Sequence, residues 1–179
     1  DSYGSWDYLP TYGQAWYPNV AFGWKPYHHG RWSFAGRFGW YWGSYDRFWG
    51  WPTHHYGRWG YAANRWFWMP GYRWSPAWVS WAYAPGYVSW CPLGFYNRPI
   101  VGFNTSFVIY PAYVWTVVPR HAFSGPVPVQ HYAVPPQAIP ASTWSRFVVR
   151  PAAPVAPTTL VARAQPIRAP TRGYAVPRS

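Results

Sequence analysis

A nine-residue phrase occurs twice in the first half of the chain, and it restricts the fold more than any other feature. Trp24-Lys-Pro-Tyr-His-His-Gly-Arg-Trp32 returns as Trp51-Pro-Thr-His-His-Tyr-Gly-Arg-Trp59. A fixed period of this length, about 27 residues, indicates that one supersecondary unit is used at least twice. Each copy runs on into short aromatic segments separated by turn-forming residues, which predicts one β-hairpin per copy.

The predicted strands follow from these aromatic segments. Residues 1–23 contain a looser echo of the phrase at Tyr12-Gly-Gln-Ala-Trp16, and we expect a degenerate strand pair or an edge strand there. A hairpin of different sequence is expected around the turn at Ala84-Pro-Gly86, since Val79-Ser-Trp81 recurs as Val88-Ser-Trp90. Aliphatic strands are predicted near residues 107–118. The strands expected in the two repeats and in the third hairpin are 30–35, 38–42, 58–62, 66–68, 75–83 and 86–90.

Composition requires the core to be aromatic. The chain holds 17 Trp, 17 Tyr and 10 Phe, together with 22 Pro and 16 Gly that would break a long helix. No stretch between residues 1 and 92 shows the apolar spacing of an amphipathic helix. We therefore predict an all-β fold, a small antiparallel aromatic-rich sheet or meander built from hairpin units of about 27 residues.

The chain changes character after residue 118. We divide it into an aromatic-rich repeated β domain, residues 1–118, and a tail rich in Pro, Ala, Val and Arg, residues 119–179. Closely spaced prolines predict an extended, polyproline-like segment that cannot fold alone. The alternatives are a disordered linker, or a segment ordered by packing on its own domain or on a neighbouring subunit. Trp144, Phe147 and Tyr174 are the expected anchors in the second case.

Charge is strongly one-sided, with 15 Lys and Arg against 3 Asp and Glu, and Lys25 is the only lysine. Arginine among so many rings favours guanidinium stacking, with a basic surface for acidic polymers as a second role. We expect stacking by Arg31, Arg37, Arg58, Arg65 and Arg73. The predicted stacking core of the repeats and the third hairpin consists of Trp24, Arg31, Trp32, Trp51, Arg58, Trp59, Trp78, Trp81 and Trp90.

Catalytic residues are scarce. The carboxylate side chains are Asp1, Asp7 and Asp46, and only Asp46 lies in the repeats, where we expect it to pair with an arginine such as Arg47 or Arg58. A glycosidase needs two facing carboxylates. Cys91 is the single cysteine, interpreted as a buried small residue or as a thiol that pairs between chains. The sequence therefore predicts no enzymatic activity and no catalytic residue.

Paired histidines recur in the repeat, at His28-His29 and His54-His55. Two such pairs could bind zinc or copper if the units faced each other. Adjacent residues on a strand point to opposite faces, so each pair would offer one ligand to a given site. Turn histidines that stack on Trp or cap backbone groups are the alternative that we favour, and no metal or cofactor is expected.

Several phrases together resemble a known family: the two copies above, Pro76-Ala-Trp-Val-Ser-Trp81, Tyr87-Val-Ser-Trp-Cys-Pro-Leu93 and Val118-Pro-Arg-His-Ala-Phe123. Over residues 8–123 the chain is similar to Trp/Tyr-rich bacterial proteins of unknown function with Tyr-Gly-Arg-Trp-type repeats, often found downstream of FecR-like domains. The resemblance implies a cell-envelope or extracellular setting and supplies no activity. No FecR-like portion is present in this sequence. The chain starts at Asp1, which we interpret as an exported protein whose signal peptide has been removed.

Three hypotheses for function follow. The first is a non-catalytic structural subunit of a bacterial cell-surface or extracellular assembly, a filament or ring, joined by aromatic and Arg stacking and by the extended tail. The second is an envelope module that binds acidic polysaccharide or another glycan through exposed Trp, Tyr and Arg. The third is nucleic-acid binding, for which charge and rings are suitable but no recognised module is present. The expected partners are other copies of the chain or a larger assembly, and no transmembrane segment is predicted.

Overall fold

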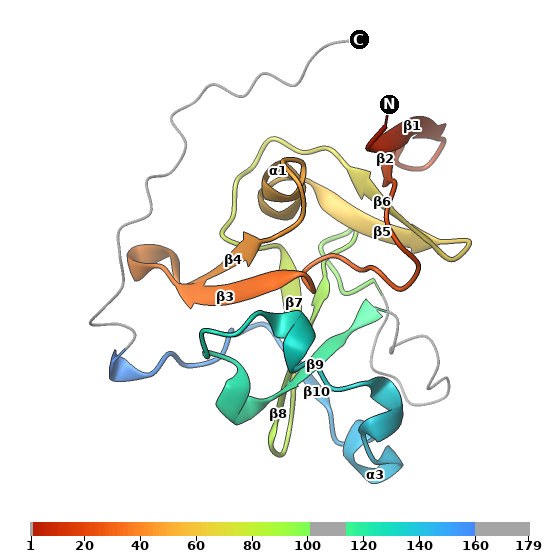
Figure 1. Cartoon of the computed structure of the whole chain (residues 1–179). Coiled ribbons are helices and arrows are strands. Elements are labelled where there is room, and N and C mark those ends of the chain that lie inside the picture. The colour runs from red at the N-terminus through yellow and green to blue at the C-terminus, as the bar shows by residue number, and fades with distance from the viewer. Residues whose placement is uncertain (1, 101–113, 160–179) are drawn as a thin grey trace.

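The computed structural model describes residues 2–100 and 114–159, and it confirms the predicted all-β fold. Its strands form two four-stranded antiparallel sheets and one two-stranded ribbon, as Figure 1 shows. The sheet orders are β1-β2-β6-β5, β10-β7-β8-β9 and β3-β4. The strands are β1 Gly4–Leu9, β2 Gly13–Pro18, β3 Gly30–Phe34, β4 Trp40–Ser44, β5 Arg58–Ala62, β6 Arg65–Met69, β7 Val79–Ala84, β8 Tyr87–Pro92, β9 Thr116–Pro119 and β10 Val148–Arg150.

Helical segments are short. The α-helices are α1 Gly50–His55 and α3 Ala141–Trp144, and 3₁₀ turns lie at Gly36–Phe38, Arg120–Ala122, Val129–His131 and Pro136–Ala138. Helix α1 occupies the second copy of the repeated phrase, so the expectation that His54 and His55 lie on a strand or in a turn is wrong. Pro52 falls in the first turn of α1, where its missing N–H has no intrahelical partner to lose.

The β1–β2, β3–β4 and β5–β6 hairpins share one construction that explains the repeated phrase. Each carries Gly-x-Trp on one strand, and the second strand places a tryptophan directly opposite the first one. The glycine is needed because that opposite indole lies over it, leaving no room for a Cβ. The Trp pairs are Trp6↔Trp16, Trp32↔Trp42 and Trp59↔Trp68, and a Cβ on Gly4, Gly30 or Gly57 would come within 2.6, 2.8 or 2.7 Å of the opposite indole.

The first copy of this unit is therefore Gly4-Ser-Trp6, and the echo that we assigned to Tyr12–Trp16 is wrong. A Cβ on Gly13 would meet nothing within 4 Å, so Gly13 does not lie under an indole. Gly4, Gly30 and Gly57 instead follow one another at nearly the interval of the repeated phrase. Residues 1–23 do form the expected strand pair, β1 with β2.

A row of four tryptophans crosses the β1-β2-β6-β5 sheet. Trp6 pairs with Trp16, Trp16 with Trp68, and Trp68 with Trp59. The row is buried along β2, β6 and β5, whereas Trp6 on the outer strand is 51% exposed. On its buried side the row packs on Trp49 and Trp24, with the Trp16 and Trp49 ring centroids 5.2 Å apart.

The β3–β4 ribbon packs against the β10-β7-β8-β9 sheet through tryptophan contacts. The Trp32 ring lies 4.8 Å from Trp81 and 5.5 Å from Trp90, and Phe123 closes the cluster. Trp81 and Trp90 face each other across the β7–β8 hairpin, as the recurring Val-Ser-Trp phrase predicts. Rings of this kind bury large areas, so a small domain gains a continuous core from few residues.

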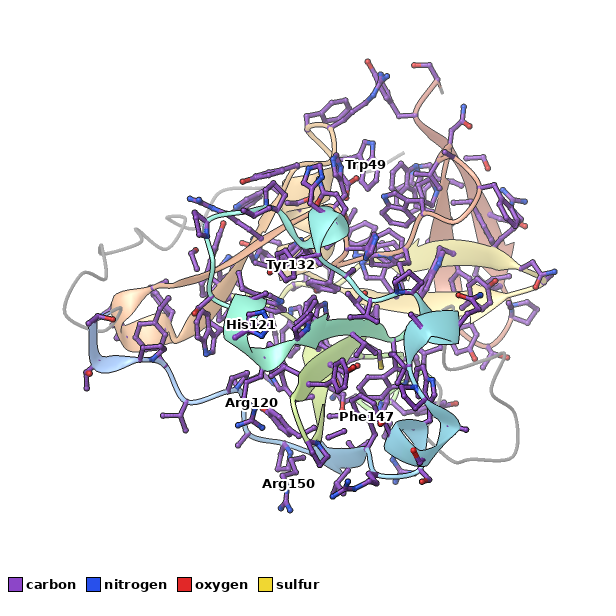
Figure 2. All side chains as sticks on the ribbon, turned by 60° about the horizontal axis from the view of Figure 1, so that its bottom comes forward. Trp49, Arg120, His121, Tyr132, Phe147 and Arg150 are labelled. Atoms are coloured by element: carbon purple, nitrogen blue, oxygen red, sulfur yellow. The ribbon has the colours of Figure 1, made fainter. Side chains whose placement is uncertain are left out.

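The proline-rich residues 119–159 lie on the body of the same chain. Val129 and Ile139 are buried, and β10 adds to the sheet by pairing with β7. Further along, the Trp40 indole donates to the carbonyl of Pro154 at 2.7 Å. In Figure 2, side chains fill the interior from Trp49 at one end to Phe147 at the other.

The expected tail anchors can now be placed. Phe147 is buried beside the half-buried Trp144, at 5.5 Å between ring centroids. Tyr174 lies outside the described residues, as do the predicted strand residues 107–110. The other predicted aliphatic strand includes β9, which pairs with β8.

Candidate functional site

The face of the β1-β2-β6-β5 sheet opposite the tryptophan row carries a half-open groove of about 670 Å³. Alternation along a strand sends Phe67 to this face, because its neighbours Trp66 and Trp68 point to the other. Rings dominate its lining, and one cation accompanies them. The residues that define the groove are Tyr12, Tyr61, Phe67, Phe95, Tyr96 and Arg98.

The floor of the groove is fixed by a glycine–phenylalanine pair. Gly60 of β5 lies directly opposite Phe67 of β6. A Cβ on Gly60 would overlap the Phe67 ring, so the far end of that ring lies against the glycine backbone. Met69 and Ala15 pack beside it in a small cluster separate from the main core. The floor is thus a ring held in one position by the sheet itself.

One wall of the groove is a tight loop after β8. The Gly94 N–H donates to the Arg98 carbonyl at 2.9 Å, and Asn97 adopts a left-handed backbone with φ of 57°. Asn is one of the few residues that tolerates this conformation. The loop presents two exposed rings, Phe95 and Tyr96, edge to face at 5.1 Å. Tyr12, from the β1–β2 turn, meets Phe95 at 5.2 Å and also lines the groove.

Arg58 holds this loop in place. Its Nε–H donates to Asn97 Oδ1 at 2.7 Å, and its guanidinium lies 3.5 Å from the centroid of the Trp78 ring. The Trp78 indole in turn donates to the carbonyl of His55 at 3.0 Å. A planar guanidinium that stacks and donates at the same time fixes its neighbours better than a flexible ammonium would. The wall is therefore ordered without a ligand.

The groove is electropositive. Arg98 lines it, and no described carboxylate pairs with Arg98, because the ion pairs of the described residues both involve Asp46. Asp7 lies on β1, where it accepts the backbone N–H of Tyr8. An uncompensated cation beside exposed rings can hold an anionic ligand through both charge and stacking.

The groove residues were largely missed by the sequence reasoning. Trp59, a predicted stacking residue, also lines the groove, but none of the six residues that define it was among the predicted site residues. A signal was present in Gly94-Phe-Tyr-Asn97, where Gly and Asn at turn positions bracket two adjacent rings that cannot both be buried. Arg58 and Trp78 were predicted to stack, and here they do so on each other.

Other predicted stacking residues lie in the interior or on the surface. Arg37 stacks on Phe38 and Arg65 stacks on Tyr17, as expected, and Arg47 stacks on Tyr3. The expected stacking of Arg31 and Arg73 is not found on any described ring, and Arg31 is exposed. Trp51 donates its indole N–H to the Tyr41 hydroxyl at 3.1 Å. The predicted tryptophans in the buried core cluster are Trp32, Trp59, Trp81 and Trp90, with Trp24 packed against it.

Asp46 is the centre of a second, buried polar cluster, and the predicted pairing with an arginine is wrong. Its Oδ1 accepts the Trp24 indole N–H at 3.0 Å and lies 3.3 Å from His29 Nδ1. The Ser44 hydroxyl donates to Oδ2 at 3.2 Å. Arg58, one of the two expected partners, is engaged by Trp78 and Asn97 instead. Aromatic and hydroxyl donors replace the expected salt bridge because the carboxylate is buried among rings.

His54 is fully buried and joins the two copies of the repeat. Its Nδ1–H donates to the Gly50 carbonyl at 2.6 Å, and its Nε2 accepts the backbone N–H of Tyr27 at 3.2 Å. The Tyr27 hydroxyl donates back to the His54 carbonyl at 2.7 Å. Burial lowers the pKa of His54 to about 4, against a weaker opposing effect of the Asp46 charge. The imidazole is therefore neutral at pH 7 and serves as a structural hydrogen-bonding group.

The four histidines do not converge on one point. His55 is buried between the rings of Tyr41 and Trp74, and its Nδ1–H donates to the Ser75 carbonyl. His28 is partly buried, and burial lowers its pKa to about 4. Within residues 2–100 and 114–159, no three His, Cys, Asp or Glu side chains are arranged to hold a metal ion. The stacking alternative describes His55 well.

Cys91 is fully buried on β8, which fits the interpretation as a small core residue. Nearby, Lys25 donates from Nζ to the carbonyl of Trp115 at 2.8 Å. Burial lowers the pKa of Lys25 to about 8, partly opposed by the charge of Cys91. The single lysine of the chain is thus used inside the fold.

In the part of the chain that the structure describes, every helix is too short or too polar to cross a membrane.

Comparison with known proteins gives one result. No curated protein and no solved structure matches the chain significantly. A family model described as a family of unknown function, DUF6600, matches residues 1–97. That segment is more than half of the 179 residues and runs from β1 through β8 to Asn97 in the groove wall. The neighbourhood of FecR-like domains stays a prediction. The chain therefore belongs to the DUF6600 family, whose function is unknown.

Proposed function

We propose that this chain is a non-catalytic binding module of the bacterial cell envelope that holds an acidic glycan in the aromatic groove. The observation that carries the proposal is the groove itself, a half-open channel with a fixed ring on its floor and two exposed rings on a braced wall. Binding sites for small ligands are concave, largely apolar and equipped with a few polar groups that fix orientation.

The chemistry of the lining suits a sugar. The C–H face of a pyranose ring packs on flat aromatic faces, and the exposed Phe95 and Tyr96 provide rings of this kind on the groove wall, above the buried Phe67. Tyrosine hydroxyls and the Arg98 guanidinium supply donors for sugar hydroxyls and carboxylates. A cation without a described carboxylate partner favours uronic acids over neutral sugars.

The bracing supports affinity. A loop that must be ordered upon binding lowers affinity, because each immobilised side chain costs about 0.5–1.5 kcal/mol. Here Arg58 already orders the loop through Asn97 and Trp78. An extended polysaccharide that binds weakly at each sugar is then held through several adjacent sugar contacts.

The non-catalytic part of the proposal rests on the carboxylates. Asp46 is buried and engaged by Trp24, His29 and Ser44, and Asp7 lies on β1 outside the groove lining. Asp1 lies outside the described residues. The His29–Asp46 pair has an orienting carboxylate, but Ser44 bonds to Asp46 rather than to the imidazole, so the pair has no adjacent nucleophile among these contacts.

Retention on immobilised polysaccharides tests the proposal. The full chain should bind polygalacturonate or alginate and bind neutral dextran weakly. Tyr96→Ala and Phe95→Ala should weaken binding by about tenfold, the equivalent of one lost ring contact. Tyr72→Ala is the matched control, because Tyr72 is 91% exposed and lies outside the groove. Equal loss in the control, or no loss in the groove variants, would contradict the groove assignment.

A second variant tests the acidic preference. Arg98→Gln should reduce binding to polygalacturonate and leave weak dextran binding unchanged, because only the charge is removed. A single-stranded oligonucleotide serves as the competing polyanion. If the oligonucleotide binds more tightly than the uronic-acid polymer and depends equally on Arg98, the nucleic-acid hypothesis replaces this one.

A structural subunit of an extracellular assembly is a second candidate. The observation that favours it is the open outer edge of β1 with the exposed rings Trp6 and Tyr8. The described part of the proline-rich segment packs on its own chain, so the edge strand is a better connector than residues 119–159.

A further inference from the structure

Strand β1 is the outer strand of its sheet and is exposed along most of its length. The sheet order places β2 on one side of β1 and no described strand on the other. Trp6 is 51% and Tyr8 is 65% exposed. In Figure 1, β1 lies at the top right of the molecule, away from the β10-β7-β8-β9 sheet. An edge of this kind offers its backbone groups to another strand.

The hydrogen bonding of the β1–β2 hairpin shows which backbone groups face outward. The Asn19 N–H donates to the Tyr3 carbonyl at 2.8 Å, so Tyr3 and Asn19 form a hydrogen-bonded pair. Such pairs alternate along an antiparallel ladder, so Gly4, Trp6 and Tyr8 turn their N–H and C=O groups away from β2. Pro18, opposite Gly4, has no N–H to give and agrees with this assignment.

The exposed end of the tryptophan row lies on the same edge. Three members of the row are buried by their neighbours, and Trp6 is covered only on the side of Trp16 and Trp68. A strand added beside β1 would bury the open face of Trp6 and continue the row across the junction. Exposed aromatic surface of this kind marks an interaction site.

We propose that β1 pairs antiparallel with β1 of a second copy of this chain, about a two-fold axis at Trp6. Trp6 then lies opposite the partner's Trp6, and Ser5 lies opposite the partner's Asp7. Gly4 lies opposite the partner's Tyr8 and has no side chain to collide with it. Such an interface is isologous, since the same strand is used by both copies.

Other registers are less favourable. An axis at Asp7 would place two carboxylates directly opposite each other at a non-hydrogen-bonded pair, where side chains are closest. An axis at Ser5 would leave Tyr8 beyond the end of the partner strand. The axis at Trp6 uses all three outward-facing residues and lets the Ser5 hydroxyl donate to the opposite carboxylate. This inference is independent of glycan binding and gives the assembly candidate a surface and a partner.

Asp7 restrains the pairing. Its Oδ1 accepts the Tyr8 N–H at 2.8 Å, which occupies one of the outward amides in the single chain. Charged residues on edge strands commonly limit unwanted pairing. Pairing at the proposed register requires Asp7 to release this amide. Removing the carboxylate should therefore strengthen association.

Sedimentation of the full chain over a range of concentrations tests the surface. The wild type should show a concentration-dependent dimer. Trp6→Pro should raise the dissociation constant by at least about tenfold, because it removes an outward N–H that β2 does not use. Asp7→Ala should lower the dissociation constant. Thermal melts of each variant separate loss of pairing from loss of folding, and Tyr72→Ala is the exposed-ring control.

A cysteine cross-link tests the register. The proposed axis places the two position-6 Cα atoms about 5.5 Å apart, within the span of a disulfide. Trp6→Cys should therefore give a covalent dimer under mild oxidation, whereas Phe22→Cys should not, although Phe22 is fully exposed and Trp6 only 51% exposed. The proposal is overturned if the wild type stays monomeric at all concentrations. It is overturned equally if Trp6→Pro dimerises as tightly as the wild type, or if Phe22→Cys cross-links as well as Trp6→Cys.

Discussion

The two copies of the repeated phrase have nearly the same residues and different conformations. In the first copy Tyr27 adopts a left-handed turn, whereas its equivalent one period later, His54, lies on helix α1. These two equivalent residues meet in the core, with ring centroids 4.7 Å apart. The Gly-Arg-Trp segments that follow have the same role in both copies, because each of them begins a hairpin.

The second difference is where each hairpin goes. The β3–β4 ribbon turns its tryptophans into the core against β7 and β8, while β5–β6 joins β2 and forms the floor of the groove. The same local construction thus supplies core tryptophans in both copies and, in the second copy, also the floor of the proposed binding surface. The Gly-x-Trp unit determines that a hairpin forms, and the strands that pack beside the hairpin determine which surface it contributes to.

The tryptophan of the Gly-x-Trp unit gives the largest contrast. Trp32→Ala should lower the free energy of unfolding by about 3–5 kcal/mol, since it empties a site surrounded by Trp42, Trp81 and Trp90. Trp6→Ala at the equivalent position of the first hairpin should cost about 1 kcal/mol or less, because that ring is half exposed. Urea unfolding followed by fluorescence measures both. Similar losses at the two positions would contradict the division into buried and exposed ends.

Acid should destabilise the fold through the histidines of both copies. Burial lowers the pKa of His54 and of His28 from the usual 6.5 to about 4. The unfolded chain therefore binds more protons than the folded chain between pH 6.5 and pH 4, and stability falls as the pH falls through this window. We expect a loss of about 2–3 kcal/mol per buried histidine at most.

Variants of the two histidines separate their contributions. His28→Gln should flatten the pH dependence at little cost at pH 7, since its Nδ1 has no described partner. His54→Gln should also flatten it but should destabilise at pH 7, because the Gly50 and Tyr27 bonds are disturbed. Unfolding measured at pH 7 and pH 4.5 checks this. An unchanged pH slope in both variants would show that other groups cause the acid sensitivity.

The repeat glycines should be sensitive for a steric reason. Gly57 has φ of 68°, and a Cβ there would overlap the Met69 carbonyl oxygen. Gly57→Ala should cost about 1–3 kcal/mol. Gly13→Ala is the matched control, since Gly13 has a similar φ of 79° and nothing within 4 Å of a Cβ. Gly13→Ala should lower the free energy of unfolding only by the cost of a positive φ at alanine, about 1 kcal/mol or less. Equal losses would show that the Met69 carbonyl and the Trp68 indole beside Gly57 move aside at little cost.

Sequence patterns predicted the hairpins well and the site poorly. The period of the phrase, the Pro-Gly turn and aromatic alternation located the strands of both repeats and of β7–β8 within a few residues. Those signals are local. Helix α1 was missed because it is very short and is held by Thr53 and by the burial of His54 rather than by its own propensity.

Non-local contacts account for the rest. Nothing in the order of residues shows that Phe95 and Tyr12 meet, or that Asp46 is surrounded by indole and hydroxyl donors. The groove is made by segments that are far apart in sequence, as Tyr12 and Arg98 show. The sequence shows that aromatic rings and arginines are abundant. Which ring each arginine stacks on depends on how the hairpins pack together, and that packing is not visible in the sequence.

The arginine of the phrase gives the smallest and most specific contrast. Arg58→Lys keeps the charge and loses the planar stack on Trp78 and the bond to Asn97, so we expect a cost of about 1 kcal/mol. Arg31→Lys, at the equivalent position of the first copy, should change stability by less than about 0.5 kcal/mol, because Arg31 is exposed and stacks on no described ring. Arg58→Lys should also weaken polygalacturonate binding, although Arg58 does not line the groove, since the loop carrying Phe95 and Tyr96 loses its brace. Unfolding and polysaccharide retention of the two variants measure both effects. If Arg58→Lys lowers stability without affecting retention, the loop keeps its position unaided, and the difference between the two copies concerns stability alone.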